Sequence, residues 1–82
     1  MLYEAKVYAM IQTQLKYAPK NSYGRTLVLQ ILKYGDFFEM FKIKPMQIAS
    51  NLGLTKSGYT LVCIAWNLYE DLKVHSFDLQ KI

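Results

Sequence analysis

The sequence has one cysteine and one histidine, so it offers few side chains from which a reactive site could be built. A single cysteine cannot form an intrachain disulfide, and Cys63 lies in an apolar segment, the usual setting of a small buried hydrophobic residue. His75 follows twelve residues later and is not placed to activate that thiol. Carboxylates come close together as Asp36 with Glu39 and as Glu70 with Asp71, both with the spacing of solvated helix turns. The sequence therefore predicts a protein that is not an enzyme and that has no metal site and no cofactor.

Long apolar runs are also missing. The two strongest, Leu27–Leu32 and Leu61–Leu68, are short and each carries a polar residue. A membrane-spanning helix needs about 18 consecutive apolar residues or more. Glu4 and Lys6 lie where a signal peptide requires an uninterrupted apolar segment. The sequence therefore predicts a cytoplasmic protein without membrane contact.

Acidic residues are few, and the excess of positive charge is concentrated in the middle of the chain. The formal net charge is +4. The segment Lys16–Lys56 holds seven basic and two acidic side chains, which gives +5, whereas the rest of the chain has −1. Such an asymmetry is typical of a protein that binds a polyanion. An ordinary lysine-rich intracellular surface would explain it equally well.

The length of 82 residues allows one domain, which spans residues 1–82. Hydrophobic residues make up 52% and aromatic residues 15% of the chain, a composition that excludes a disordered tail. Because so short a chain builds only a small core, association with a second copy is a natural supplement. We therefore expect a homodimer.

Apolar spacing predicts helices in the first half of the chain. The segment Leu2–Tyr17 contains no glycine or proline and has one apolar face at helical spacing. This face comprises Tyr3, Val7, Met10, Ile11 and Leu15. Residues 18–24 are rich in turn-forming residues and predict a loop, in which Ser22 is a candidate cap. A second helix is predicted over Arg25–Tyr34, and Gly35 is expected to end or kink it.

The second half of the chain has clearer boundaries. The aromatic segment 37–43 is compatible with a helix or with a short strand. Proline suits the first turn of a helix, so Pro45–Leu52 is predicted to be a helix that ends at the glycine that follows. Thr55 is a plausible cap for a further helix that ends near residues 69–72. The last stretch, Leu72–Ile82, is compatible with a strand or with a frayed helix.

The most informative pattern lies in Ile48–Trp66, which reads IASNLGLTKSGYTLVCIAW. It resembles the helix-turn-helix of winged-helix transcription regulators, in which Ile/Leu-Ala and Leu-Gly-Leu/Val precede Ser/Thr, a polar residue and Ser. In such a motif Ala49 lets the second helix cross closely and Gly53 permits the tight turn. Leu54 would fill the angle between the helices, and Thr55 would cap the recognition helix. The resemblance implies a mainly α fold with a helix-turn-helix of winged-helix type.

The same resemblance implies sequence-specific binding to double-stranded DNA by a small regulator of transcription, replication or partition. Base edges would be reached from the first turns of the recognition helix. The candidates for base contact are Lys56, Ser57, Thr60 and Tyr59, of which Tyr59 is equally well explained as a core residue. The candidates for phosphate contact, which positions the protein without reading sequence, are Lys42, Lys44, Lys20 and Arg25. The helix Leu2–Tyr17 would pair with its symmetry mate, and the small basic chain would suit a mobile element.

Two features depart from the family pattern. The helix after Thr55 carries two apolar stripes, so it is expected to be buried on both sides. The stripes are Tyr59, Val62, Cys63 and Trp66, and Leu61, Ile64, Ala65 and Leu68. Only Leu72–Ile82 follows, without a turn glycine, so the wing is predicted to be reduced or absent. These features favour an alternative function, a protein-interaction module or inhibitor that binds its partner through Leu61, Ile64 and Leu68 without binding DNA.

Overall fold

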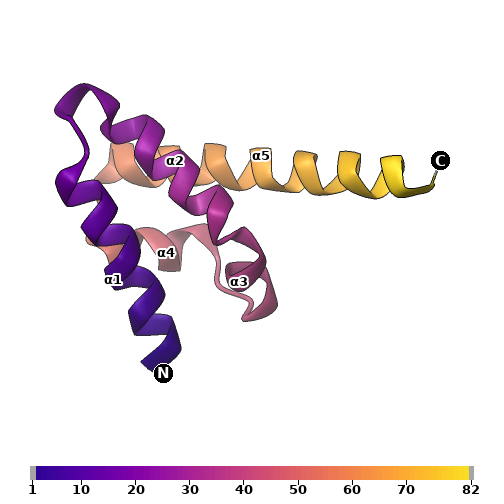
Figure 1. Cartoon of the computed structure of the whole chain (residues 1–82). Coiled ribbons are helices and arrows are strands. Elements are labelled where there is room, and N and C mark those ends of the chain that lie inside the picture. Colours follow the sequence, from indigo (N-terminus) through magenta and orange to yellow (C-terminus); the bar gives the residue numbers. More distant parts are fainter. Residues whose placement is uncertain (1, 82) are drawn as a thin grey trace.

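The computed structural model describes the backbone of residues 2–81 and the side chains of residues 3–75. Regular structure in this part of the chain is entirely helical. It comprises α1 (Leu2–Tyr17), the 3-10 turn η1 (Lys20–Ser22), α2 (Tyr23–Lys33), α3 (Gly35–Met40), α4 (Pro45–Leu52) and α5 (Lys56–Lys81). Figure 1 shows the shorter helices gathered around the first half of α5, while its second half projects away from them. The prediction of a mainly α fold is confirmed.

Helix α1 has the predicted bounds and packs into the core of its own chain, against α2 and α4. Its buried side chains are Val7, Tyr8, Ile11 and Leu15. Tyr3 and Met10, predicted to lie on the same face, are 64% and 48% exposed. They lie at one edge of the apolar arc, and the helix is rotated so that Tyr8, at the opposite edge, is buried instead.

The connection between α1 and α2 contains the 3-10 turn η1, closed by a hydrogen bond from the Ser22 amide to the Pro19 carbonyl at 2.8 Å. Helix α2 begins at Tyr23, two residues earlier than predicted. The prediction that Ser22 caps this helix is wrong, because its side chain makes no capping hydrogen bond. Leu27 and Ile31 of α2 are fully buried, and α2 forms the most extensive helix pair of the fold with α5.

Gly35 marks the change of direction from α2 to α3, as predicted. A side chain is excluded here, since a Cβ on Gly35 would lie 2.9 Å from Cγ of Tyr69 and closer still to two other ring carbons. The aromatic segment that follows forms helix α3 and not a strand, and it places Phe38 in the centre of the core. The amide of Ile43 then donates to the carbonyl of Phe38 at 2.8 Å, which closes the turn before α4.

Helix α5 is longer than predicted and continues through the segment whose structure the sequence left open. No strand occurs between residues 2 and 81, so a wing is absent from the part of the chain that the structure describes. The buried face of α5 comprises Gly58, Val62, Ala65 and Tyr69. The prediction that α5 is buried on both sides is wrong, because Ile64 and Leu68 are 48% and 43% exposed. The shorter helices cover only one side of α5.

Candidate nucleic-acid interface

Helices α4 and α5 are joined by three residues in a tight turn. Pro45 begins α4, and the Lys44 amide donates to Oε1 of Gln47 at 3.1 Å across its first turn. Gly53 ends α4 in the left-handed conformation (φ 68°), and the amide of Leu54 returns to the carbonyl of Ala49 at 3.0 Å. Only glycine adopts this conformation without strain, so the turn requires a glycine at position 53.

Close approach of the turn to α5 depends on a second glycine. Leu54 is half-buried in the angle between the helices, as predicted. A Cβ on Gly58 would lie 2.9 Å from Cβ of Leu54, so Gly58 leaves room for that side chain. Ile48, Ala49 and Leu52 face inward and are buried. The outer surface of the pair is therefore formed by the opposite face of α4 and by the first turn of α5.

The first turn of α5 presents polar side chains to solvent. Thr55 caps the helix, as predicted, because its Oγ1 accepts a hydrogen bond from the Gly58 amide at 3.4 Å and lies 3.1 Å from Oγ of Ser57. The hydroxyl of Thr60 donates to the carbonyl of Lys56 at 3.1 Å. Lys56, Ser57 and Thr60 are all exposed, and the turn contains no acidic residue. Positive charge, two hydroxyls and a helix N-terminus thus share one surface, which suits a polyanion.

Tyr59 lies at the edge of this surface and is half-buried. Interaction with the Cys63 thiol raises the pKa of the Tyr59 hydroxyl above that of an ordinary tyrosine. Both its predicted roles, core residue and base contact, remain compatible with this position.

The four candidate phosphate contacts divide into two groups. Lys20 and Arg25 flank the start of α2. This start lies beside the second turn of α5, because a Cβ on Gly24 would be 3.5 Å from Cδ1 of Leu61. Lys42 and Lys44 belong to the segment between α3 and α4, and both line a pocket against α5. The sequence alone did not predict this division.

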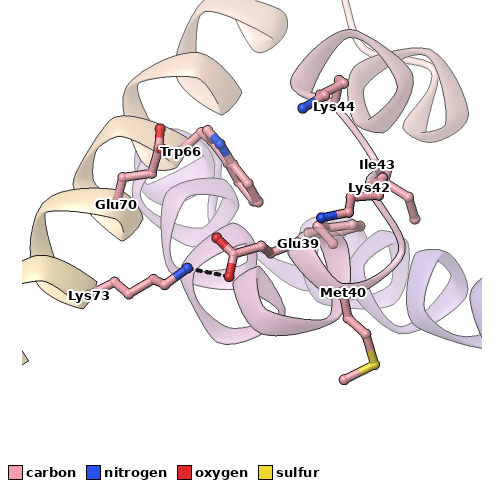
Figure 2. Close-up of a pocket in the computed structure, with 9 residues that line it drawn as sticks. Glu39, Met40, Lys42, Ile43, Lys44, Trp66, Glu70 and Lys73 are labelled. Atoms are coloured by element: carbon pink, nitrogen blue, oxygen red, sulfur yellow. Dashed lines mark hydrogen bonds and ion pairs between the residues drawn. The ribbon is translucent and has the colours of Figure 1, made fainter. Parts of the chain in front are cut away.

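The pocket has a volume of about 530 Å³ and is lined by both charged and aromatic side chains. Figure 2 shows the amino groups of Lys42 and Lys44 directed toward α5, which contributes Trp66, Glu70 and Lys73. Lys73 forms an ion pair with Glu39 of α3 across it. Trp66, which belongs to an apolar stripe predicted to be buried, is only half-buried. Trp66, Glu70 and Lys73 follow one another at i, i+4 and i+7, the spacing that places all three on one face of α5. Because two carboxylates lie among three lysines, the pocket is less positive than the lysines alone suggest.

A hydrogen bond fastens α5 to α3 near this pocket. The hydroxyl of Tyr69 donates to Oδ1 of Asp36 at 2.5 Å. Burial, followed by the bond to Asp36, raises the pKa of Tyr69 above that of an ordinary tyrosine. The neutral form of Tyr69 is therefore the one that the folded state stabilises.

Stability should consequently depend on Tyr69 at alkaline pH. A pKa that is higher in the folded than in the unfolded state gives a contribution that is complete below about pH 10 and declines above it. Between pH 8 and pH 11, the free energy of unfolding of the wild type should fall by about 1 kcal/mol more than that of Tyr69→Phe. Urea denaturation of both proteins at pH 8 and pH 11 measures this difference. Equal losses in the two proteins would contradict the assignment, since every other side chain is the same in both.

Comparisons of the chain with protein-family models, with curated protein sequences and with solved structures found no match. Among the described residues, no helix is long and apolar enough to cross a membrane. The same residues contain no group of three histidine, cysteine or carboxylate side chains that could hold a metal ion.

Proposed function

We propose that this protein is a sequence-specific double-stranded DNA-binding protein, a small regulator of transcription, replication or partition. Its helix-turn-helix would be of winged-helix type without a wing. The observation that carries the proposal is the exposed first turn of α5, where Lys56, Ser57 and Thr60 stand clear of the core. A major groove admits one helix, and the N-terminal residues of a recognition helix contact base edges there.

The charge distribution supports the same proposal. Residues 2–55 hold seven basic and three acidic side chains, so the net charge of +4 lies outside α5. Of these basic residues, Lys20 and Arg25 precede and follow Gly24 in the chain, and Gly24 lies beside Leu61 in the second turn of α5. They would contact phosphates on the flanks of the base-reading turn, and Lys42 and Lys44 would contact them from the segment before α4.

Fluorescence anisotropy with duplex DNA across a salt series tests the proposal. If four or more phosphates are contacted, the logarithm of the binding constant should fall with the logarithm of salt concentration at a slope of about −4 or steeper. Absence of binding even at low salt would exclude the proposed function.

Lys56→Ala should weaken DNA binding by roughly tenfold, because it removes a cation at the centre of the interface. If Lys56 contacts a phosphate, the salt slope should also decrease by about 1. Lys6→Ala is the matched control, since Lys6 is an exposed lysine of α1, and Figure 1 shows the N-terminal part of α1 away from the start of α5. Equal affinities of the two variants would remove Lys56 from the interface.

A further inference from the structure

One face of α5 is apolar and exposed although it lies outside the core. Ile64, Leu68 and Leu72 are 48%, 43% and 57% exposed and follow one another at steps of four residues. Residues four apart are neighbours on a helix surface, so the three side chains form a continuous row, here called the α5 row. Continuous exposed apolar surface marks a site of interaction more often than scattered single residues do.

In the second half of α5, as far as its side chains are described, no residue after Tyr69 is packed into the core of its own chain, and Lys73 contacts α3 through an ion pair with Glu39 at the surface. The last buried residue of the described helix is Tyr69, and the side chains of residues 70–75 are all exposed. The projecting segment from Glu70 to Lys81 has 12 residues. Helical segments shorter than about 12–15 residues are only marginally stable in water without tertiary contacts. A second helix along the α5 row would supply those contacts.

Charge favours a second copy of the chain as this partner. Residues 56–75 of α5 hold two basic and two acidic side chains and are neutral, whereas residues 2–55 carry +4. Two copies of a basic chain repel each other least where they meet along a neutral surface. Ile64 and Leu72 each lie four residues from Leu68. The α5 row therefore matches a second copy of itself rotated by 180° about Leu68, as two-fold symmetry requires. We propose that α5 pairs antiparallel with α5 of a second copy about an axis at Leu68, which brings Ile64 against the partner's Leu72.

This register determines the distance between the two DNA-binding ends. Lys56 precedes Leu68 by 12 residues. At a rise of 1.5 Å per residue, the two Lys56 positions therefore lie about 36 Å apart along the paired helices. Half-sites one turn of B-DNA apart are separated by about 34–36 Å. The match in spacing rests on the proposed function, whereas the pairing of the two helices does not.

Light scattering tests the pairing in the absence of DNA. The wild type at about 50 µM should have twice the chain mass of 9.6 kDa, and Leu68→Asp should have the mass of one chain, because it places a charge on the two-fold axis. The matched control is Val74→Asp, which introduces the same charge at a side chain of α5 that is 59% exposed and lies about 120° around the helix from Leu68. Val74→Asp should remain a dimer. A wild type with the mass of one chain would overturn the inference and leave the α5 row to a different protein.

Disulfide formation tests the register. In a Cys63→Ala background, Leu68→Cys should cross-link on oxidation, because the two positions meet on the axis. Leu72→Cys should not cross-link, because its two copies are about 12 Å apart along the helices and a disulfide requires Cα atoms within about 7 Å. Cross-linking of Leu72→Cys but not of Leu68→Cys would overturn the proposed register.

Paired half-sites at varied spacing separate this inference from the proposed function. We expect the tightest binding when half-site centres are about 10 base pairs apart. A cross-linked dimer that binds no DNA would contradict the proposed function and leave the pairing intact. DNA binding by a protein that stays monomeric and fails to cross-link at Leu68 would contradict the pairing and leave the function intact.

Discussion

Replacing Phe38 by alanine is expected to lower the free energy of unfolding by about 3–5 kcal/mol. Phe38 is 0% exposed, and its ring centroid lies 6.0 Å from that of Tyr8 and 5.6 Å from that of Phe37. Truncation would remove these contacts and leave a cavity between α1 and α3. A chain of this length has a total stability of roughly 4–12 kcal/mol, so the variant should lose about a quarter of it or more. Urea denaturation followed by circular dichroism measures the loss.

Phe41→Ala provides the matched control, because it truncates the same side-chain type on the segment that follows α3. Phe41 is 42% exposed and contacts Phe37 at a centroid distance of 5.0 Å. We expect it to cost about 1–2 kcal/mol, less than Phe38→Ala, since 42% of its surface stays in water in the folded state. Comparable losses in both variants would show that Phe38 is not the centre of the core.

Gly35→Ala is expected to destabilise the fold by about 2–3 kcal/mol, although alanine is the better helix former. The added methyl group would overlap the ring of Tyr69, with Cγ only 2.9 Å away. That ring cannot move freely, because Tyr69 is 8% exposed and its hydroxyl is bonded to Asp36. The clash would therefore separate α3 from α5 or break the bond to Asp36.

Gly24→Ala separates this clash from the general effect of adding a methyl group to a helix. At Gly24 the nearest atom to a new Cβ is Cδ1 of Leu61 at 3.5 Å, an ordinary van der Waals distance. This variant should be unchanged or up to about 1 kcal/mol more stable than the wild type. If Gly35→Ala behaved in the same way, the close packing of α3 on Tyr69 would be wrong. Thermal and urea denaturation of the two variants together decide the matter.

The proposals assign three tasks to one helix. The first turn of α5 would read DNA, its buried face packs on α2 and α4, and the α5 row would pair with a second copy. The pairing would also explain why Ile64 and Leu68 stay exposed in a single chain. The sequence suggested α1 as the element that pairs with its symmetry mate, but the apolar face of α1 is used within its own core.

Local chemistry was enough to predict several helix boundaries. Proline at position 45 and glycine at position 53 restrict the backbone at the two ends of α4, and its predicted bounds are those of the structure. The same is true of α1, where no glycine or proline interrupts the helix between Leu2 and Tyr17. The Thr55 cap was also predicted, since a threonine hydroxyl bonds an amide only a few residues away.

Features that depend on contacts between distant residues were not predictable in this way. Apolar spacing identified the apolar faces of α1 and α5, but it did not show which edge of each face meets the core. Tyr3 and Ile64 were therefore expected to be buried and are exposed.

The sequence by itself determined that the chain is mainly helical, where α1 and α4 begin and end, and that the segment Lys16–Lys56 is basic. Those properties depend on neighbours within a few residues or on simple composition. Only the tertiary structure decided that Lys42 and Lys44 lie with Trp66 at one pocket, apart from Lys20 and Arg25. It also decided which apolar row of α5 remains uncovered. The physical reason is that burial is set by the helices packed around a residue, and that arrangement depends on contacts such as Gly35 with Tyr69, which no local pattern contains.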